Sequence, residues 1–172
     1  MKNVLTLILL LQISNASILE VVPYVSPQKF SGLWYEIART QNSYQEECVA
    51  SSVEYILEEN EYEVYNRCFD KKIGADLIEY KGTAQAALTQ GNMSSIDMTY
   101  FWIFTKRYKV FYLEENYKYA LIADSELEQL WIMSRTPKID EKQLENILAL
   151  LEGNMDLKRL IYTPQDEQGR YK

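Results

Sequence analysis

The segment Gly32-Leu33-Trp34-Tyr35-Glu36-Ile37-Ala38-Arg39 constrains the fold of this 172-residue chain more than any other. It places a glycine just before a strand that begins with a tryptophan. This pattern is typical of a chain that enters a small β-barrel through a tight bend, because the flat indole of Trp34 can seal the barrel floor. Further along the chain, a second strand ends at Ser134-Arg135-Thr136-Pro137, and its arginine can lie over such a ring. These two motifs and the strands between them predict one closed β-barrel.

The chain between the two motifs alternates strands with turns about every eight to fourteen residues, as antiparallel sandwiches and barrels do. Before the first strand, residues 18–30 are expected to be an extended lead-in, interrupted by Pro23 and Pro27. Strands are expected at 33–40, 49–58, 62–68, 78–88, 95–101, 108–114, 117–124 and 128–136, with a short last strand at 160–163.

Alternate residues of these strands share one face and are candidates for the barrel interior. The candidates combine apolar side chains with tyrosines and one small residue. They are Val53, Tyr55, Tyr62, Val64, Ala84, Met98, Tyr100, Tyr108, Val110 and Tyr112. The small residues Gly82, Ala84 and Ala86 have two interpretations. Either they leave room in the interior, or they accommodate neighbouring tyrosines or an external helix.

One amphipathic helix is expected after the strands. Asp140 is a good N-cap, with Gln143 at the capping-box position, and Gly153 ends the helix. Its apolar stripe comprises Leu144, Ile147, Leu148 and Leu151. We expect this stripe to pack on the outside of the barrel. The alternative, a membrane-binding helix, is less favoured because the polar face is acidic rather than basic.

The first residues have the pattern of a secretory signal. Lys2 precedes an apolar run over residues 4–13, and Ser14-Asn15-Ala16 forms a small-x-small cleavage site. We therefore expect a signal peptide at 1–16 and a single barrel domain at 17–172; the alternative is an N-terminal buried strand. Because no cysteine lies near the cut, a thioether-linked lipid is not expected there, and the mature chain is expected in the periplasm or outside the cell.

Cys48 and Cys68 are the two cysteines of the chain, and they flank a candidate hairpin. In an oxidising compartment they are expected to form a disulfide, and the alternative is two free thiols. A simple hairpin register leaves Cys48 about three positions away from its partner, so a bulge or bend must bring it in.

Composition excludes several classes of function. The formal charge of −7 opposes binding to nucleic acid through charge. The chain contains no histidine, which excludes Ser–His–Asp and Cys–His catalysis and histidine-based zinc or haem sites. We expect no catalytic residues, no metal and no cofactor. An enzyme acting on a lipid-like substrate inside the barrel remains an alternative, and Glu36 is the carboxylate to examine first, although a buried hydrogen-bonded role suits it better.

The motifs resemble those of the lipocalins. Gly32 to Arg39 is similar to the Gly-x-Trp signature, in the form typical of bacterial lipocalins and apolipoprotein D, and Leu130 to Pro137 is similar to that subgroup's last barrel strand. Asn66-Arg67-Cys68 resembles the end of the third strand in this subgroup. In Glu115-Asn116-Tyr117 only the tyrosine of the family's Thr-Asp-Tyr motif is retained. The resemblance covers about residues 30–163.

This resemblance implies an eight-stranded antiparallel up-and-down barrel with one C-terminal helix outside, closed at one end and holding one small hydrophobic molecule. It also implies that Gly32, Trp34 and Arg135 are structural residues of the closed end. Bacterial relatives commonly bind fatty acids or lysophospholipids, so such a lipid is the expected ligand. Another hydrophobic ligand, such as a pigment or tetrapyrrole, is the alternative.

A last group of residues is expected at the rim of the open end. Residues 102–107 are expected to form a loop in which three large apolar residues precede two cations. We expect Trp102 and Phe104 to contact a membrane surface transiently or to close over the ligand; the alternative is that both fold inward. Asn92-Met93-Ser94 matches a glycosylation acceptor, a short motif that often arises by chance.

Overall fold

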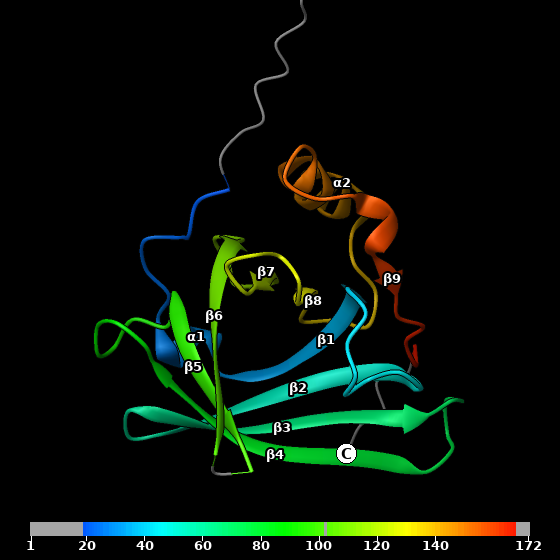
Figure 1. Cartoon of the computed structure of the whole chain (residues 1–172), viewed down its shortest axis with the longest axis horizontal. Helices are drawn as coiled ribbons and strands as arrows, with labels where there is room; N and C mark the ends of the chain where they lie inside the picture. Colours follow the sequence, from blue (N-terminus) through cyan, green and yellow to red (C-terminus); the bar gives the residue numbers. More distant parts are fainter. Residues whose placement is uncertain (1–18, 102, 168–172) are drawn as a thin grey trace, which may run out of the picture.

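The computed structural model describes residues 19–101 and 103–167, so the expected signal peptide lies outside the described residues. The chain forms nine strands and three short helical segments in this part (Figure 1). The strands are β1 Gly32–Arg39, β2 Cys48–Glu58, β3 Glu61–Asp70, β4 Leu77–Ala86, β5 Ser95–Tyr100, β6 Phe104–Leu113, β7 Tyr119–Ala123, β8 Leu130–Ser134 and β9 Ile161–Tyr162. The helices are α1 Pro27–Phe30 and α2 Glu141–Leu151, with the 3-10 turn η1 Leu157–Arg159.

Eight of these strands close a barrel, which confirms the predicted fold class. Neighbours pair antiparallel in the order β2-β3-β4-β5-β6-β7-β8-β1, and pairing of β1 with β2 completes the ring. β9 adds to β1 outside this ring through Ala38 and Arg39. Each strand follows the previous one through a short connection, so the topology is up-and-down, and all strands lie within a few residues of the predicted ranges.

The hairpin between β5 and β6 is shorter than predicted. β6 begins at Phe104, whereas residues 102–107 were expected to form a loop. Thr105 pairs with Thr99, and Arg107 pairs with Asp97 through two hydrogen bonds of 2.8 and 2.9 Å. The turn can be this tight because Phe101 adopts a positive φ of 51°. The predicted loop is thus mostly strand.

The lead-in also differs from the extended segment that was expected. Residues 27–30 form the short helix α1, with Pro27 at its start and Ser26 as its N-cap. The backbone N–H of Met93 donates to the carbonyl of Val25, and the side-chain amide of Asn92 donates to Pro23. The Asn92 amide, noted as a glycosylation motif, thus fastens the lead-in across one end of the barrel.

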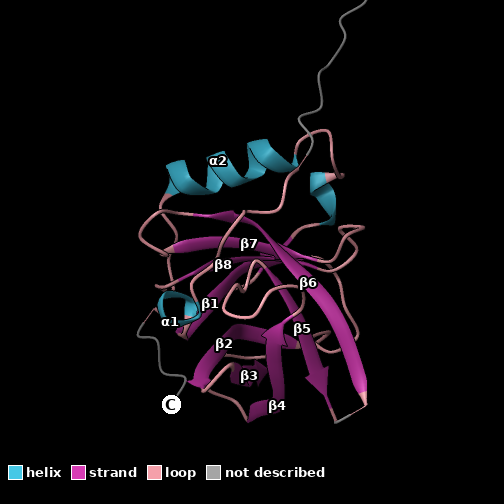
Figure 2. Cartoon of the chain, turned by 90° about the vertical axis from the view of Figure 1, so that its left-hand side faces the viewer, coloured by secondary structure: helices cyan, strands magenta, loops and turns pink. Residues whose placement is uncertain are grey.

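The apolar residues form two main clusters separated by the barrel wall. One fills the barrel interior, and the other joins the outer face of β7 and β8 to the helix α2. Figure 2 shows α2 lying over β7 and β8 on the outside of the barrel. Ile147 and Leu151 of α2 are fully buried in the outer cluster, which confirms the external position predicted for this helix. The Asp140 side chain caps α2 by accepting from the backbone N–H of Gln143 at 3.1 Å.

The prediction that Tyr112 faces the interior is wrong. The pairing of β6 with β7 shifts between Val110 and Tyr112, which marks a bulge at Phe111. A bulge adds one residue to a strand and reverses the alternation of faces beyond it. Tyr112 therefore joins the outer cluster, where its hydroxyl donates to the side chain of Gln143 at 3.0 Å, and Leu113 turns inward instead.

The seam between β1 and β2 is only partly paired. The two strands pair over residues 32–35 and 52–55, and beyond Tyr35 the C-terminal segment takes over. Thr163 donates its N–H to Ile37, and Pro164 accepts from Ala50. Residues 161–164 thus bridge the two strands near the open end. In the part of the chain described, no helix has the length and apolar character needed to cross a bilayer.

Candidate functional site

Trp34 and Arg135 close one end of the barrel. Trp34 is fully buried, and its indole N–H donates to the carbonyl of Phe30 at 2.9 Å. The Arg135 guanidinium lies 3.8 Å from the centre of the indole ring. Gly32 has a φ of +96°, a backbone conformation that residues with a side chain rarely adopt, so the backbone at this bend favours glycine.

Arg135 also donates hydrogen bonds to several backbone carbonyls at this end of the barrel. Its Nη1 donates to Leu33 at 2.8 Å, and its Nη2 faces the carbonyls of Lys29, Phe30 and Ser31 at 2.9–3.0 Å. Burial lowers the pKa of Arg135 to about 10, which leaves it charged at neutral pH. These contacts tie α1 to the first residues of β1, so the floor is sealed by groups that are fully engaged with one another.

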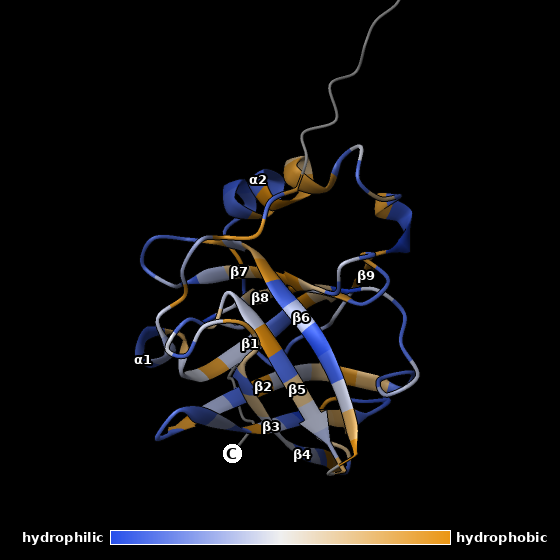
Figure 3. Ribbon diagram, turned by 60° about the vertical axis from the view of Figure 1, so that its left-hand side comes forward, coloured by the Kyte–Doolittle hydropathy of each residue, from blue (hydrophilic) through white to orange (hydrophobic). Residues whose placement is uncertain are grey.

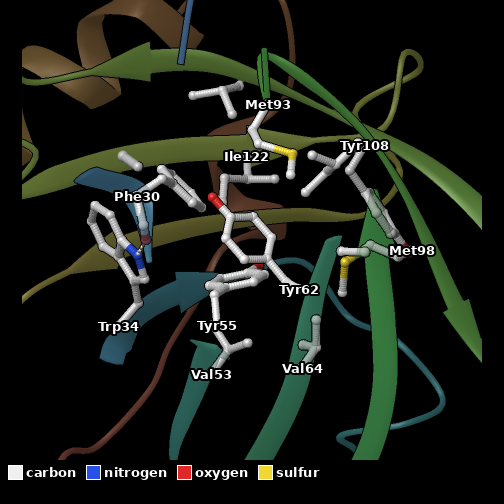
Figure 4. Packing of buried hydrophobic residues seen from close by; sticks show 14 of the residues in the cluster. Phe30, Trp34, Val53, Tyr55, Tyr62, Val64, Met93, Met98, Tyr108 and Ile122 are labelled. Carbon is white, nitrogen blue, oxygen red and sulfur yellow. Dashed lines mark hydrogen bonds between the residues drawn. The ribbon is translucent and has the colours of Figure 1, made fainter. Parts of the chain in front are cut away.

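Aromatic rings fill the closed half of the interior. The ring centre of Tyr55 lies 5.4 Å from that of Phe30 and 5.2 Å from that of Tyr62 (Figure 4). The Tyr62 hydroxyl donates to the carbonyl of Pro27 at 2.7 Å. Tyr55 and Tyr62 therefore form the upper surface of the sealed floor.

Tyr100 lies against the inner wall. A Cβ added to Gly82 would come within 2.8 Å of the Tyr100 ring and 2.6 Å of the Thr99 carbonyl oxygen. From β5 the ring therefore passes over β4, and its hydroxyl accepts from the Asn66 side chain of β3 at 2.9 Å. The first interpretation of the small residues, that they leave room, is wrong for Gly82, because a tyrosine ring fills the space beside it.

Polar groups ring the open half. The Tyr108 ring meets Trp131 edge-on at 5.3 Å, and its hydroxyl donates to the Gln129 side chain at 2.6 Å. The ammonium of Lys106 lies 5.6 Å from the Tyr108 ring centre and 2.7 Å from an Asp124 carboxylate oxygen. This end therefore has mixed aromatic, neutral polar and charged groups, unlike the sealed floor.

The structure brings nearly all of the predicted interior residues together. Tyr100 packs against the edge of the inner cluster and Tyr112 lies outside the barrel. The others belong to the buried inner cluster: Val53, Tyr55, Tyr62, Val64, Ala84, Met98, Tyr108 and Val110. Sequence reasoning missed Phe30, Met93, Ile122, Met133 and the partly buried Trp131. The alternation of Ala120 with Ile122 and of Trp131 with Met133 is a signal that could have found the strand residues.

The remaining predicted residues lie at the rim and in the disulfide. Cys48 and Cys68 form the predicted disulfide, with a Cα–Cα distance of 5.4 Å, and a bulge in β2 between Val49 and Ser52 shifts the register.

At the rim, Phe104 is 64% exposed, so it does not fold inward. Trp102 lies outside the described residues. The tip of the β5–β6 hairpin is hydrophobic (Figure 3), and Ile103 there is 74% exposed.

Glu36, the candidate for acid–base chemistry, is engaged in the β1–β2 seam. Its carboxylate accepts hydrogen bonds from Thr163 Oγ1 and, at 2.7 Å, from Gln45 Nε2, and it lies 3.3 Å from Arg39 Nε. Burial raises the pKa of Glu36, although these three partners lower it. The carboxylate thus joins the C-terminal segment and the β1–β2 loop to β1.

Two surface recesses flank β9, with volumes of about 230 and 300 Å³. Both are bordered by Thr163 and lie on the outside of the barrel. Among the described residues, no group of three or more Cys, Asp or Glu side chains is arranged to hold a metal ion.

Comparisons with known proteins agree with this geometry. The family model of the lipocalin-like domain matches residues 25–165. R877, named as a lipocalin, from Acanthamoeba polyphaga mimivirus is 32% identical over 130 residues, covering 72% of this chain and 75% of that protein. The outer membrane lipoprotein Blc of Vibrio cholerae is 30% identical over 141 residues, covering 79% and 80%. The structure of insecticyanin from the tobacco hornworm Manduca sexta superposes with a TM-score of 0.67 at 17% identity, covering 85% of each chain.

Proposed function

Because the chain belongs to the lipocalin family, whose members are generally binding proteins for small hydrophobic molecules, we propose that it carries or scavenges a long-chain lipid in its barrel. A fatty acid or a lysophospholipid is the ligand that the interior suits best. The observation that carries the proposal is the asymmetry of the barrel, because one end is sealed by Trp34 and Arg135 and the other carries Tyr108, Trp131 and the Lys106–Asp124 pair.

The chemistry of the inner wall supports an apolar ligand with a polar end. Val53, Val64, Met98 and Val110 supply aliphatic surface, and tyrosines add rings with hydroxyl tips. Burial of about fifteen methylenes at ~0.8 kcal/mol each contributes on the order of 12 kcal/mol before ordering costs, which predicts micromolar to high-nanomolar affinity. Met98 and Met133 are unbranched and flexible, so they can change rotamer to admit the chain.

The rim supports loading from a membrane surface. Phe101, Ile103 and Phe104 expose more than half of their surface at the tip of the β5–β6 hairpin. The neighbouring cations are already paired, Lys106 with Asp124 and Arg107 with Asp97. Contact with a bilayer would therefore depend on apolar insertion and change little with salt.

We also propose that the chain is exported and acts in the periplasm or outside the cell. The N-terminal signal pattern and the Cys48–Cys68 disulfide both suit an oxidising compartment.

Displacement of the neutral dye Nile red from the delipidated protein tests the carrier function. Palmitate and lysophosphatidylcholine are each expected to displace the dye at one site per chain. Met98→Trp, which adds bulk inside the barrel, should weaken displacement, whereas Tyr112→Phe, on the outer face, should not. The proposal fails if neither lipid displaces the dye from the folded protein, and conversion of the lipid would favour an enzyme instead.

Transfer from vesicles tests the rim. The double variant Ile103→Ser, Phe104→Ser should take up lipid from phosphatidylcholine vesicles several-fold more slowly, with unchanged affinity for free palmitate. Leu88→Ser is the matched control, because Leu88 is also 74% exposed but lies in the β4–β5 connection at the sealed end. Equal uptake rates for the wild type and the double variant would refute membrane contact.

A further inference from the structure

The tyrosine hydroxyls inside the barrel differ in how far the protein satisfies them. Tyr62 donates to Pro27, and Tyr108 donates to Gln129. The Tyr100 hydroxyl accepts a hydrogen bond from the Asn66 amide, so its own proton is still available. The Tyr55 hydroxyl has no hydrogen-bond partner among the described residues, although Tyr55 as a whole is only 4% exposed.

The fully buried side-chain atoms without a hydrogen-bond partner in the described chain are Arg39 Nε, Ser51 Oγ and Ser52 Oγ, so the Tyr55 hydroxyl is not fully enclosed by protein. A hydroxyl that the protein neither bonds nor encloses can donate to a ligand or to water. In Figure 4 the hydroxyl end of Tyr55 points away from Trp34, toward the side of the cluster where Val64 and Met98 lie. Tyr55 lies on top of the sealed floor. The hydroxyl is thus placed at the deep end of the ligand space proposed above.

The charge of the surroundings limits what can bind there. The buried charged residues of the described chain are Glu36, Arg39, Asp124 and Asp166. Glu36 and Arg39 lie together in the seam, Asp124 pairs with Lys106 at the open end, and Asp166 interacts with Tyr35 near the C-terminal segment. Arg135 is on the far side of the Trp34 ring. A carboxylate lowered onto Tyr55 would therefore lack a cation and would be costly to desolvate.

We propose that Tyr55, with Tyr100 above it, forms a donor subsite that recognises an uncharged oxygen, such as a ketone or ester carbonyl, on the buried part of the lipid. This inference rests on the proposed carrier function and specifies the ligand class: a lysophospholipid or another lipid with an ester or ketone group can use the subsite, whereas a plain fatty acid with its carboxylate at the open end cannot. The charged group of the lipid then stays at the open end, near Lys106. Burial raises the pKa of Tyr55 and raises that of Tyr100 to about 12, so both remain protonated donors at physiological pH.

Two matched probes test this subsite by Nile red displacement. One is methyl pentadecyl ketone, and the other is its isostere in which a methylene group replaces the carbonyl oxygen. The wild type should bind the ketone about fivefold more tightly, the value of one neutral hydrogen bond of about 1 kcal/mol. Tyr55→Phe should abolish this preference, Tyr100→Phe should reduce it, and Tyr112→Phe, outside the barrel, should preserve it.

Stability without ligand separates a ligand contact from a structural role. Tyr55→Phe should leave the urea midpoint of the empty protein unchanged or slightly raised, because the hydroxyl that it removes has no partner. Tyr62→Phe should lower the midpoint, because it loses the bond to Pro27. Equal binding of the two probes by the wild type, or a preference that survives in Tyr55→Phe, would overturn the subsite alone. Failure of every probe, palmitate included, would overturn the carrier function and the subsite together.

Discussion

Arg135→Lys is expected to destabilise the sealed end while keeping its positive charge. The guanidinium uses three nitrogens: Nη1 and Nη2 bond the backbone between Lys29 and Leu33, and Nε donates to the carbonyl of Tyr117 at 3.2 Å. An ammonium is a compact point charge on a flexible stem and cannot reproduce this planar fork. We expect one or two carbonyls to lose their charged donor.

The size of the effect follows from these contacts. Each charged hydrogen bond lost costs about 1.5–3 kcal/mol, and the partly exposed position of Arg135 reduces this value. Loss of the stacked cation over Trp34 adds about 0.5–1 kcal/mol. We therefore expect the free energy of unfolding to fall by about 2–3 kcal/mol, which lowers the urea midpoint by about 1 M or more.

Urea titration followed by tryptophan fluorescence measures this shift. Arg159→Lys is the matched control, because Arg159 pairs with the exposed Glu128 at 3.0 Å, and such surface pairs contribute about 1 kcal/mol or less. If Arg135→Lys and Arg159→Lys give equal midpoints, the bonds around Trp34 do not hold the floor together and the reasoning is wrong.

Two further predictions concern stability. Replacing both Cys48 and Cys68 by serine should lower the free energy of unfolding by about 3 kcal/mol, because the bridge joins residues 20 apart, and a urea midpoint equal to that of the oxidised wild type would contradict this. Glu36→Gln tests the raised pKa of Glu36. A carboxyl group whose pKa is higher in the folded than in the unfolded state adds to the free energy of unfolding at low pH. This contribution is lost as pH rises through the pKa of the folded state. The stability of the wild type relative to Glu36→Gln should therefore decrease from pH 4.5 toward neutral pH, and titrations across that range that show an increase would refute it.

The barrel could be predicted from the sequence because its signals are local. Alternation along a strand is a property of the backbone, so Val53 with Tyr55 and Tyr62 with Val64 identify their inner face without knowledge of the partners. The Trp34 and Arg135 motifs then set the order of the strands. The helix α2 likewise follows from its cap at Asp140 and its apolar stripe.

The wrong predictions arise where a bulge or a tight turn interrupts the strand pattern and no glycine or other turn residue indicates it. The bulge at Phe111 needs no glycine, so no residue in the sequence marks it. Residues Tyr108 to Leu113 are mostly large and apolar, so either set of alternate residues could face the interior. Contact with α2 therefore decides the position of Tyr112. The tight turn after Tyr100 likewise contains no glycine, asparagine or aspartate. Phe101 takes the left-handed conformation there, and turn-residue preferences do not indicate it.

Tyrosines with the same alternation differ in function because of their tertiary neighbours. The Tyr62 hydroxyl has a hydrogen-bond acceptor only because α1 places the carbonyl of Pro27 beside it, and α1 was not expected from the sequence. Tyr100 reaches Asn66 only because Gly82 lies between them and has no side chain. The sequence predicts five inward tyrosines, but Tyr112 lies outside the barrel. Among the other four, the paired strands and the lead-in leave Tyr55 as the one whose hydroxyl makes no hydrogen bond within the described part of the chain, and this difference is the basis of the proposed donor subsite.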